Sequence, residues 1–227
     1  DEADKETFAA EMADAHVLLH VLEIVTADVI DAAPNLRLIQ KIGVGVNTID
    51  LDGAAQNGVA VCNMPGTNSR AVAEMTLTLM LAALRRVPYF DSRMRAGDGW
   101  TANLNSFDGL GEIARRTVGL VGYGDVARLL APVLMAMGAH VLYTATSEKG
   151  DAGADWRELP DLLREADIVS LHLPLTPATK HMIDGAAIKS MKPGAVLVNT
   201  ARGGLVDETA LIRALKSGHL RAAGLDV

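Results

Sequence analysis

Residues 118–127 read Val-Gly-Leu-Val-Gly-Tyr-Gly-Asp-Val-Ala, and this segment is more informative about the fold than any other. An apolar run leads into the pattern Gly-x-Gly-x-x-Ala, and helical periodicity then continues to Met137. Gly122 permits a tight turn, Gly124 lets backbone N–H groups approach a pyrophosphate at the positive end of a helix, and Ala127 allows close helix–strand packing. The segment predicts a dinucleotide-binding turn. The alternative is a plain strand-to-helix turn that needs two glycines.

Short aliphatic runs alternate with helical segments on both sides of this turn. Most runs are apolar at consecutive positions, which is typical of parallel strands covered on both faces. The predicted strands are residues 16–22, 36–42, 59–63, 117–121, 140–145, 168–173, 195–200 and 222–227. The predicted helices between them include residues 49–56, 125–137, 156–166 and 208–217. This order predicts an α/β protein with doubly wound parallel sheets.

The alternation of strands and helices is interrupted once. A long predicted helix begins at Asn68 or Ser69 and ends near Arg85, before the pair Val87-Pro88, and a short helix follows. We expect a domain boundary in this region, with the long helix as the bridge.

Composition and charge exclude several classes of protein. The 28 acidic and 21 basic residues give a net charge of -7, which is the wrong sign for electrostatic binding to nucleic acid. The most apolar stretch, residues 71–84, contains Glu74 and is shorter than the ~20 residues of a membrane span. Cys62 is the only cysteine, so no internal disulfide can form. No signal peptide is recognisable at the start of the sequence, and a cytoplasmic location is the default expectation.

The end of the second predicted strand of the dinucleotide-binding unit bears on the choice of cofactor. An NAD site expects Asp or Glu about twenty residues after the first glycine, to bind the ribose hydroxyls. Ala145 occupies that position, and Thr146, Ser147 and Lys149 follow it. Because no carboxylate repels a 2'-phosphate there, and hydroxyl and ammonium groups can bind one, the sequence favours NADP over NAD. The alternative is a solvated loop with a weak preference for NAD.

A second candidate site follows the predicted strand at residues 195–200. Arg202 comes directly after it, before a helix that Asp207 can cap. Ligands of doubly wound sheets bind at the carboxyl ends of the strands. A guanidinium there can hold the carboxylate of an α-keto acid through two parallel hydrogen bonds, although a surface salt bridge is the commoner role of an arginine.

Taken together, these motifs resemble the D-isomer-specific 2-hydroxyacid dehydrogenase family. The resemblance extends over essentially the whole chain, in order and with normal spacing. The segments that carry it are residues 43–50 (Gly-Val-Gly-Val-Asn-Thr-Ile-Asp), 63–68 (Asn-Met-Pro-Gly-Thr-Asn), 72–74 (Val-Ala-Glu), 122–127 (Gly-Tyr-Gly-Asp-Val-Ala), 172–179 (His-Leu-Pro-Leu-Thr-Pro-Ala-Thr), 191–195 (Met-Lys-Pro-Gly-Ala), 199–204 (Asn-Thr-Ala-Arg-Gly-Gly) and 224–227 (Gly-Leu-Asp-Val).

The resemblance implies a fold and a division into segments. It implies a Rossmann NAD(P)-binding domain and a partial, flavodoxin-like substrate domain that lacks its first strand. On this reading residues 1–68 form the partial substrate domain, residues 69–97 an interdomain helical region, and residues 98–227 the NAD(P)-binding domain.

The resemblance also implies roles for individual residues. Arg202 would be the catalytic arginine that orients the carbonyl and carboxylate of a small 2-oxo or 2-hydroxy acid, and the amides of Val44 and Gly45 would bind the carboxylate. The residues implied or inferred to line the cofactor are Thr76, Gly122, Gly124, Asp125, Val126, Ala145, Thr146, Leu173, Pro174, Thr200, Ala201, Arg202 and Asp226. Two of them have plain alternatives: Thr76 could bond back to its own helical turn, and Asp226 could be a strand-end carboxylate facing water.

The acid/base pair of the family is absent from the sequence. The resemblance implies a His supported by a Glu, both after the position of Val227. The six histidines present lack the Pro-His context of that residue and are interpreted as structural or solvated, with His172 nearest the expected cleft. We therefore expect the chain to be an internal part of a longer enzyme or a truncated product.

The resulting hypothesis is hydride transfer between NAD(P)H and a small 2-oxo acid. A non-catalytic, NAD(H)-sensing regulator similar to transcriptional corepressors, or a catalytically incomplete fragment, is the alternative. A homodimer is expected, because the apolar residues 71–84 and the segment 89–96 offer hydrophobic surface and family members that resemble this chain pair through that region. No metal site and no membrane partner are predicted.

Overall fold

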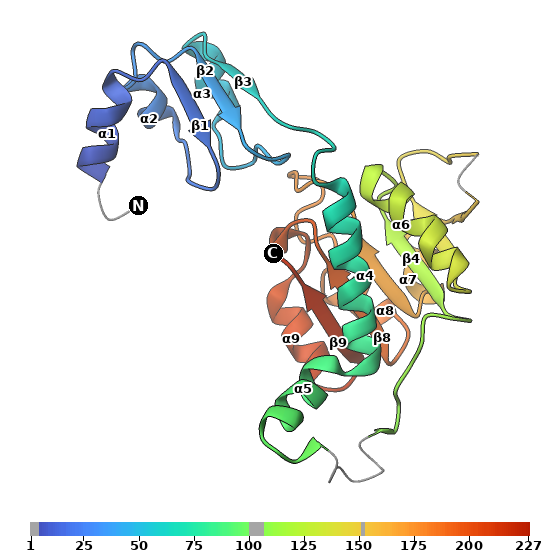
Figure 1. Ribbon diagram of the computed structural model, residues 1–227. Helices are drawn as coiled ribbons and strands as arrows, with labels where there is room; N and C mark the ends of the chain where they lie inside the picture. Colours follow the sequence, from blue (N-terminus) through green and yellow to red (C-terminus); the bar gives the residue numbers. More distant parts are fainter. Residues whose placement is uncertain (1–4, 100–106, 151–152) are drawn as a thin grey trace. The chain divides into compact units, whose positions relative to one another are not determined.

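The computed structural model describes residues 5–99, 107–150 and 153–227 (Figure 1). The chain divides into two compact units, Asp1–Asn68 and Ser69–Val227, and each is described by itself.

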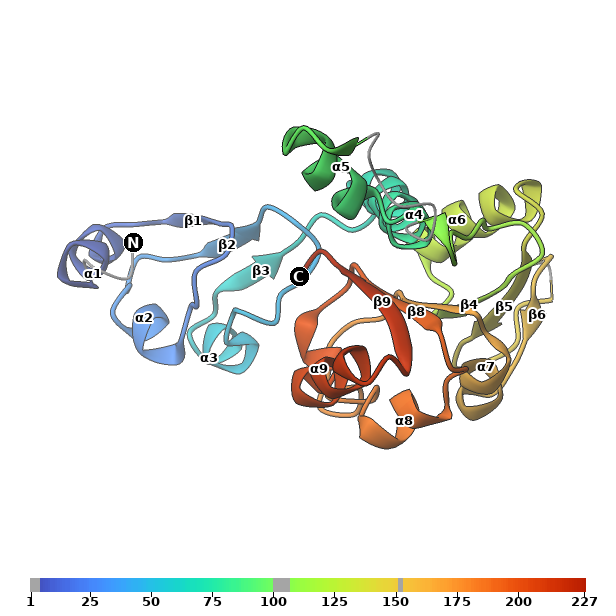
Figure 2. The same cartoon turned by 90° about the horizontal axis from the view of Figure 1, so that it is seen from below.

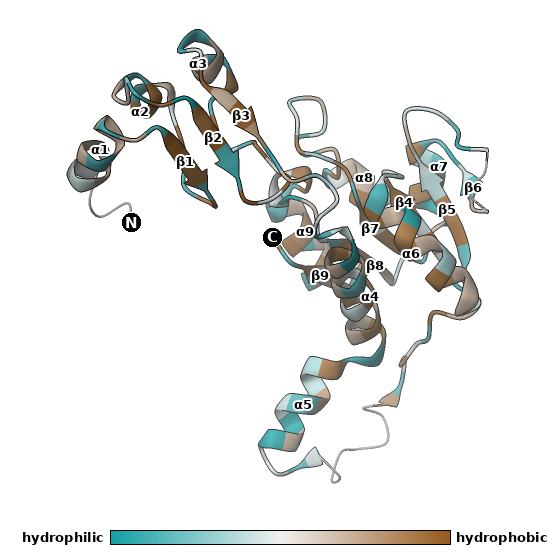
Figure 3. Ribbon diagram, turned by 45° about the horizontal axis from the view of Figure 1, so that its top comes forward, coloured by the Kyte–Doolittle hydropathy of each residue, from teal (hydrophilic) through white to brown (hydrophobic). Residues whose placement is uncertain are grey.

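The N-terminal unit is built on a three-stranded parallel sheet. The strands are in the order β1-β2-β3, and Figure 2 shows α2 and α3 on one side of them. β1 is hydrophobic over its first three residues (Figure 3). The elements are α1 (Lys5–Ala13), β1 (Val17–His20), α2 (Ala27–Asp31), β2 (Leu38–Lys41), α3 (Leu51–Gln56) and β3 (Ala60–Cys62). Their core includes the buried side chains of Ile30, Leu36 and Ile39.

The C-terminal unit contains a six-stranded sheet in the order β6-β5-β4-β7-β8-β9, with every neighbouring pair parallel. Its strands are β4 (Thr117–Val121), β5 (His140–Thr144), β6 (Asp155–Trp156), β7 (Ile168–Leu171), β8 (Ala195–Asn199) and β9 (Leu220–Leu225). Its helices are α4 (Ser69–Arg85), α5 (Val87–Arg95), α6 (Asp125–Ala136), α7 (Leu159–Glu165), α8 (Gly185–Ser190), α9 (Glu208–Lys216) and the short 3-10 helix Gly203–Leu205.

Helices cover both faces of this sheet, as Figure 2 shows, with α4 and α6 on one side and α7, α8 and α9 on the other. Each side has its own core. Met80 and Leu130 contribute to the first, and Leu162, Ile188 and Leu211 to the second. Consecutive residues of the central strands point alternately into the two cores, which explains why these strands are apolar throughout.

The predicted fold class, doubly wound parallel sheets, is confirmed, and two element predictions need correction. The helix expected from residue 156 begins at Leu159, because Asp155 and Trp156 pair with β5 as an edge strand. β9 begins at Leu220 rather than at residue 222. The start was placed too late because Arg221 interrupts the apolar pattern of this strand. Helices α1, α2 and α8 were not predicted.

The long helix α4 packs within the C-terminal unit. It contacts β8, β9 and α6, and it buries Met80 and Leu84. It ends where Arg86 adopts a left-handed conformation (φ 53°), and Pro88 follows at the start of α5. The division into residues 1–68, 69–97 and 98–227 stays a prediction. Within the described residues, no helix has the length and apolar character needed to cross a membrane.

Candidate functional site

The turn between β4 and α6 has the geometry of a phosphate-binding turn. Gly122 has a φ of +94°, and its backbone N–H donates to the Thr144 carbonyl at 3.0 Å. A β carbon at Gly122 would lie 2.4 Å from the carbonyl oxygen of His172. Both the conformation and the close approach therefore require glycine at this position.

Gly124 is required by neither conformation nor packing within the protein. It is the N-cap residue of α6 (φ −87°), and a β carbon there would meet nothing within 4 Å. The space beside it lies at the positive end of a twelve-residue helix. This open space next to helix N–H groups fits a dinucleotide pyrophosphate. Asp125 is exposed and Val126 half-buried beside it, whereas Ala127 is fully buried.

The loop after β5 is held by a buried tyrosine. The Tyr143 hydroxyl accepts a hydrogen bond from the Lys149 N–H at 2.5 Å and donates to the Lys149 carbonyl at 3.1 Å. Ala145 is half-buried, Thr146 is exposed, and the Lys149 ammonium donates to the Ser147 hydroxyl at 3.0 Å. The side chains of Thr146, Ser147 and Lys149, which the sequence suggests as ligands of a 2'-phosphate, therefore lie on one loop that is held by hydrogen bonds to Tyr143.

Asn199 fixes the turn that carries Arg202. Its buried side chain accepts from the Ala201 N–H at 3.0 Å and donates to the Arg202 carbonyl at 2.8 Å. Arg202 is half-buried, extended at φ −151°, and donates to the Ala201 carbonyl at 2.6 Å. β4 and β8 are both strands of one parallel sheet, so Arg202 and Gly124 follow strands that end at the same edge.

Thr76 and Thr200 form a buried pair. Their hydroxyl oxygens are 2.9 Å apart, and the Thr76 hydroxyl is also 2.7 Å from the Val72 carbonyl. Because the single Thr76 proton goes to Val72, Thr200 donates to Thr76. Thr76 is 0% exposed, so the bond back to its own turn is present and its contact with a cofactor stays a prediction.

The other predicted cofactor residues lie at the same edge. Leu173 is half-buried and Pro174 exposed just after β7, and Leu173 Cβ lies 3.2 Å from the position of a β carbon on Gly122. Asp226 is exposed, and its backbone N–H donates to the Asn199 carbonyl at 3.0 Å. The structure thus brings the ends of β4, β7, β8 and β9 together at one edge.

Val44 and Gly45 belong to the N-terminal unit, on the loop after β2. Gly43 precedes them with a φ of +145°, the Met64 N–H donates to its carbonyl at 2.9 Å, and the Asn63 amide donates to the Val44 carbonyl at 2.8 Å. These contacts define the loop conformation. Substrate binding by the Val44 and Gly45 amides stays a prediction.

His172 lies half-buried at the end of β7. Its Nε2 atom is shielded from solvent and has no hydrogen-bond partner among the described residues, and burial lowers its pKa from 6.5 to about 4. The ring is therefore neutral at physiological pH and cannot serve as a ready proton donor. Sequence reasoning missed the shielded Nε2 atom of this ring and the anchoring roles of Asn199 and Tyr143. The sequence signal that could have indicated these roles is a polar side chain within or at the end of an otherwise apolar strand.

The lowered pKa of His172 predicts how stability depends on pH. The unfolded chain takes up a proton near pH 6.5 and the folded chain only near pH 4. The free energy of unfolding is therefore expected to fall as the pH drops through this window, by on the order of 3 kcal/mol. His172→Gln should reduce that dependence in urea titrations at pH 7 and pH 4.5, whereas His16→Gln, at an exposed position, should retain it. Parallel losses in wild type and His172→Gln would contradict the assignment.

Comparisons with known proteins agree with this geometry. Residues 77–227 match the family model described as D-isomer specific 2-hydroxyacid dehydrogenase, NAD binding domain. D-3-phosphoglycerate dehydrogenase of Mycobacterium leprae is 43% identical over 100% of this chain and 43% of its own length. Glyoxylate reductase of Aeropyrum pernix is 39% identical over 98% of this chain and 69% of its own length.

A solved structure of a 2-hydroxyacid dehydrogenase is also similar to this chain. D-lactate dehydrogenase from Aquifex aeolicus, complexed with NAD and lactic acid, has a TM-score of 0.89 and 32% identity, over 96% of this chain and 66% of that one. The chain spans 43% of the length of the phosphoglycerate dehydrogenase relative. Because the family model matches more than half of the chain, and the glyoxylate reductase match covers more than two thirds of that relative, the chain belongs to the D-isomer-specific 2-hydroxyacid dehydrogenase family.

Proposed function

We propose that the protein transfers a hydride between NAD(P)H and a small 2-oxo acid, with the D-2-hydroxy acid on the other side of the reaction. One observation carries the proposal. Arg202 and the Gly124 turn follow parallel strands that end at one edge of the same sheet, where ligands of this architecture bind. The test of this proposal is an assay of 2-oxo acid reduction by the full-length enzyme, in which the reaction is monitored as the loss of absorbance of the reduced cofactor.

The cofactor site fits a nicotinamide dinucleotide. The N–H groups at the start of α6 would bind the pyrophosphate, and the loop of Ala145 and Thr146 would face the adenosine ribose. When bound, the cofactor supplies the hydride from its nicotinamide ring. Thr200, fixed by Thr76, keeps oxygen lone pairs available as an acceptor because its own proton is used in the bond to Thr76.

Arg202 is the substrate residue of the proposal. Its planar guanidinium can bind a carboxylate through two bonds and polarise the neighbouring carbonyl. Asn199 fixes the backbone on either side of it, which limits the positions that the guanidinium can take. The proton for the carbonyl oxygen stays assigned to the histidine that the resemblance implies beyond Val227, since His172 is held neutral by burial.

We further propose a preference for NADP(H). Thr146, Ser147 and Lys149 lie on a loop that the Tyr143 hydroxyl holds through hydrogen bonds to the Lys149 backbone. The position at which an NAD site has a carboxylate is occupied by Ala145. A charge-assisted hydrogen bond contributes about 1.5–3 kcal/mol, so one good contact to a 2'-phosphate favours NADPH about tenfold or more.

Ala145→Asp tests the cofactor preference. The new carboxylate should repel the 2'-phosphate and accept from the ribose hydroxyls, so the ratio of kcat/KM with NADPH to that with NADH is expected to fall about tenfold or more. Ala145→Asn, which has the same shape without the charge, should change the ratio much less. A higher kcat/KM with NADH than with NADPH in the unaltered full-length enzyme would sink the preference.

A cytoplasmic homodimer is also proposed for the full-length enzyme. α4 buries Met80 and Leu84 within its own unit, and the exposed apolar residues that support a dimer are Met75 on α4 and Val87 and Met94 on α5. A monomeric mass by light scattering would contradict the dimer.

A further inference from the structure

Two loops leave the carboxyl edge of the N-terminal sheet as neighbours. Residues 21–25 follow β1 and form the first loop, and residues 42–48 follow β2 and form the second. The strands that carry them pair in parallel, so both loops start at the same edge. They are joined again at their far ends, where the Val25 N–H donates to the Thr48 carbonyl at 2.9 Å.

Two buried side chains hold the first loop from within the unit. His20 is 3% exposed, and its Nε2 atom donates to the Glu23 carbonyl. Lys41 is 7% exposed, and its ammonium donates to the Val21 carbonyl. The backbone of the first loop is therefore fixed at two carbonyl groups. The function proposed above uses neither of these contacts.

The side chains that the two loops expose are mostly aliphatic. On the first loop Val21, Leu22 and Ile24 are 57%, 78% and 65% exposed, and on the second loop Ile42 and Val44 are exposed. We call these five residues the aliphatic rim. Single exposed apolar residues are ordinary, whereas a group of them on adjacent loops is typical of a surface that binds another molecule.

The aliphatic rim lacks basic side chains. Glu23 is the only charged residue of the two loops, and it is exposed. The ammonium of Lys41 lies beneath the first loop, at the Val21 carbonyl. Aliphatic side chains cannot replace the hydration of an anion, and the Glu23 carboxylate repels one. A group that lies on this rim is therefore expected to be uncharged and apolar.

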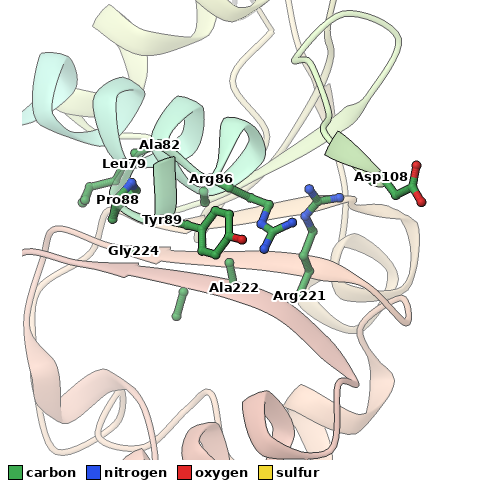
Figure 4. Close-up of a pocket in the computed structure, with 12 residues that line it drawn as sticks. Leu79, Ala82, Arg86, Pro88, Tyr89, Asp108, Arg221, Ala222 and Gly224 are labelled. Atoms are coloured by element: carbon green, nitrogen blue, oxygen red, sulfur yellow. The ribbon is translucent and has the colours of Figure 1, made fainter. Parts of the chain in front are cut away.

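The C-terminal unit has a hollow of about 560 Å³ between α4, α5 and β9. Figure 4 shows the Arg86 and Arg221 guanidinium groups beside the Tyr89 ring in it. Two cations suit an uncharged aliphatic group less well than the rim does. In addition, α4 and α5 carry the exposed apolar residues assigned above to the dimer, so no ligand is assigned to this hollow.

We propose that the aliphatic rim binds the side chain of the substrate, and that the substrate is a 2-oxo acid with an uncharged aliphatic side chain rather than one with a second carboxylate or a phosphate. This inference rests on the proposed function and on the predicted binding of the substrate carboxylate by the Val44 and Gly45 amides. In a 2-oxo acid the side chain begins two bonds from the carboxylate carbon. A carboxylate at these amides therefore places the side chain next to Val44 and the first loop.

Two substrates that differ only at the end of the side chain test the proposal. 2-Oxopentanoate ends in a methyl group, and 2-oxopentanedioate has a carboxylate in its place. With reduced cofactor saturating, the full-length enzyme is expected to have a kcat/KM about tenfold or more higher for 2-oxopentanoate, because the second carboxylate would lose hydration against the rim. 3-Phosphohydroxypyruvate should be reduced as poorly as 2-oxopentanedioate.

Substitutions in the first loop should change the ratio of these two kcat/KM values. Leu22→Arg is expected to lower the ratio about tenfold or more, because a guanidinium can pair with the second carboxylate. Glu23→Gln should lower it a few-fold by removing the repulsion. Ile212→Arg, at an exposed position on α9, is the matched control and should leave the ratio unchanged. A folding defect lowers both constants equally, so the ratio reports on recognition of the side chain.

Glyoxylate, which has no side chain, separates this inference from the proposed function. If glyoxylate is reduced but the wild type does not favour 2-oxopentanoate, or if Leu22→Arg has the same ratio as the Ile212→Arg control, the inference is overturned and the proposed function stands. If neither glyoxylate nor either of the paired substrates is reduced, the proposed function fails and the inference fails with it.

Discussion

Arg202→Lys is expected to lower kcat/KM for the 2-oxo acid by roughly 10²-fold or more in the full-length enzyme, although the charge is kept. Lysine is a point donor and cannot reproduce the two parallel bonds of a planar guanidinium to a carboxylate. A 10²-fold loss corresponds to about 2.7 kcal/mol of transition-state stabilisation. Because Asn199 holds the backbone of this turn, the lysine would start from the same place and differ only in its head group.

Steady-state kinetics with each substrate varied in turn provide the measurement. The Michaelis constant for the cofactor should change much less than kcat/KM for the 2-oxo acid, since the altered group contacts the acid. Arg213→Lys makes the same replacement at an exposed position and should have near wild-type kinetics. Near-normal turnover of Arg202→Lys would show that Arg202 is only structural.

The parallel sheets were predictable because the local pattern and the tertiary environment agree. Residues 117–121 were expected to form a strand, and β4 has these bounds. It is a central strand, so helices cover both of its faces. Its continuous apolar run therefore indicates a buried parallel strand. The edge strand β6 was missed because two residues carry no periodicity, and only their pairing with Leu142 and Tyr143 makes them a strand.

The residues of the candidate site that would contact ligands could be predicted from the sequence, but the residues that hold them in place could not. Glycines and an arginine after strands mark the edge where ligands bind, so Gly122, Gly124 and Arg202 could be read from the sequence. Asn199 acts through hydrogen bonds to atoms two and three residues away, which depend on the conformation of the turn. The shielding of the His172 Nε2 atom depends on neighbours from other elements, which no local pattern contains.

The structure also separates two glycines that the motif treats alike. Gly122 has positive φ, and a β carbon there would collide with the His172 carbonyl, so its replacement disturbs the fold itself. Gly124 has an ordinary φ and open space around it. A defect at Gly122 would therefore report on stability, and only Gly124 offers a direct test of the dinucleotide site.

Gly124→Val is expected to abolish binding of NAD(P)H, with affinity reduced by about 10²-fold or more, while the sheet stays folded. The branched side chain would occupy the space through which a pyrophosphate reaches the N–H groups at the start of α6, and each bond to a charged group that is lost costs about 1.5–3 kcal/mol. Inside the protein the same side chain meets no atom, and replacing glycine at an N-cap costs only about 1 kcal/mol.

Titration of the cofactor by its fluorescence measures the affinity, and thermal melting measures the fold. Gly185→Val is the matched control, because Gly185 is the first residue of α8, on the face of the sheet away from α6, and a β carbon there makes an ordinary contact of 3.7 Å with Ala210. The control should bind cofactor as the wild type does. Unchanged affinity in a folded Gly124→Val protein would mean that the pyrophosphate does not approach this turn, and the two glycines would then serve only to connect β4 to α6.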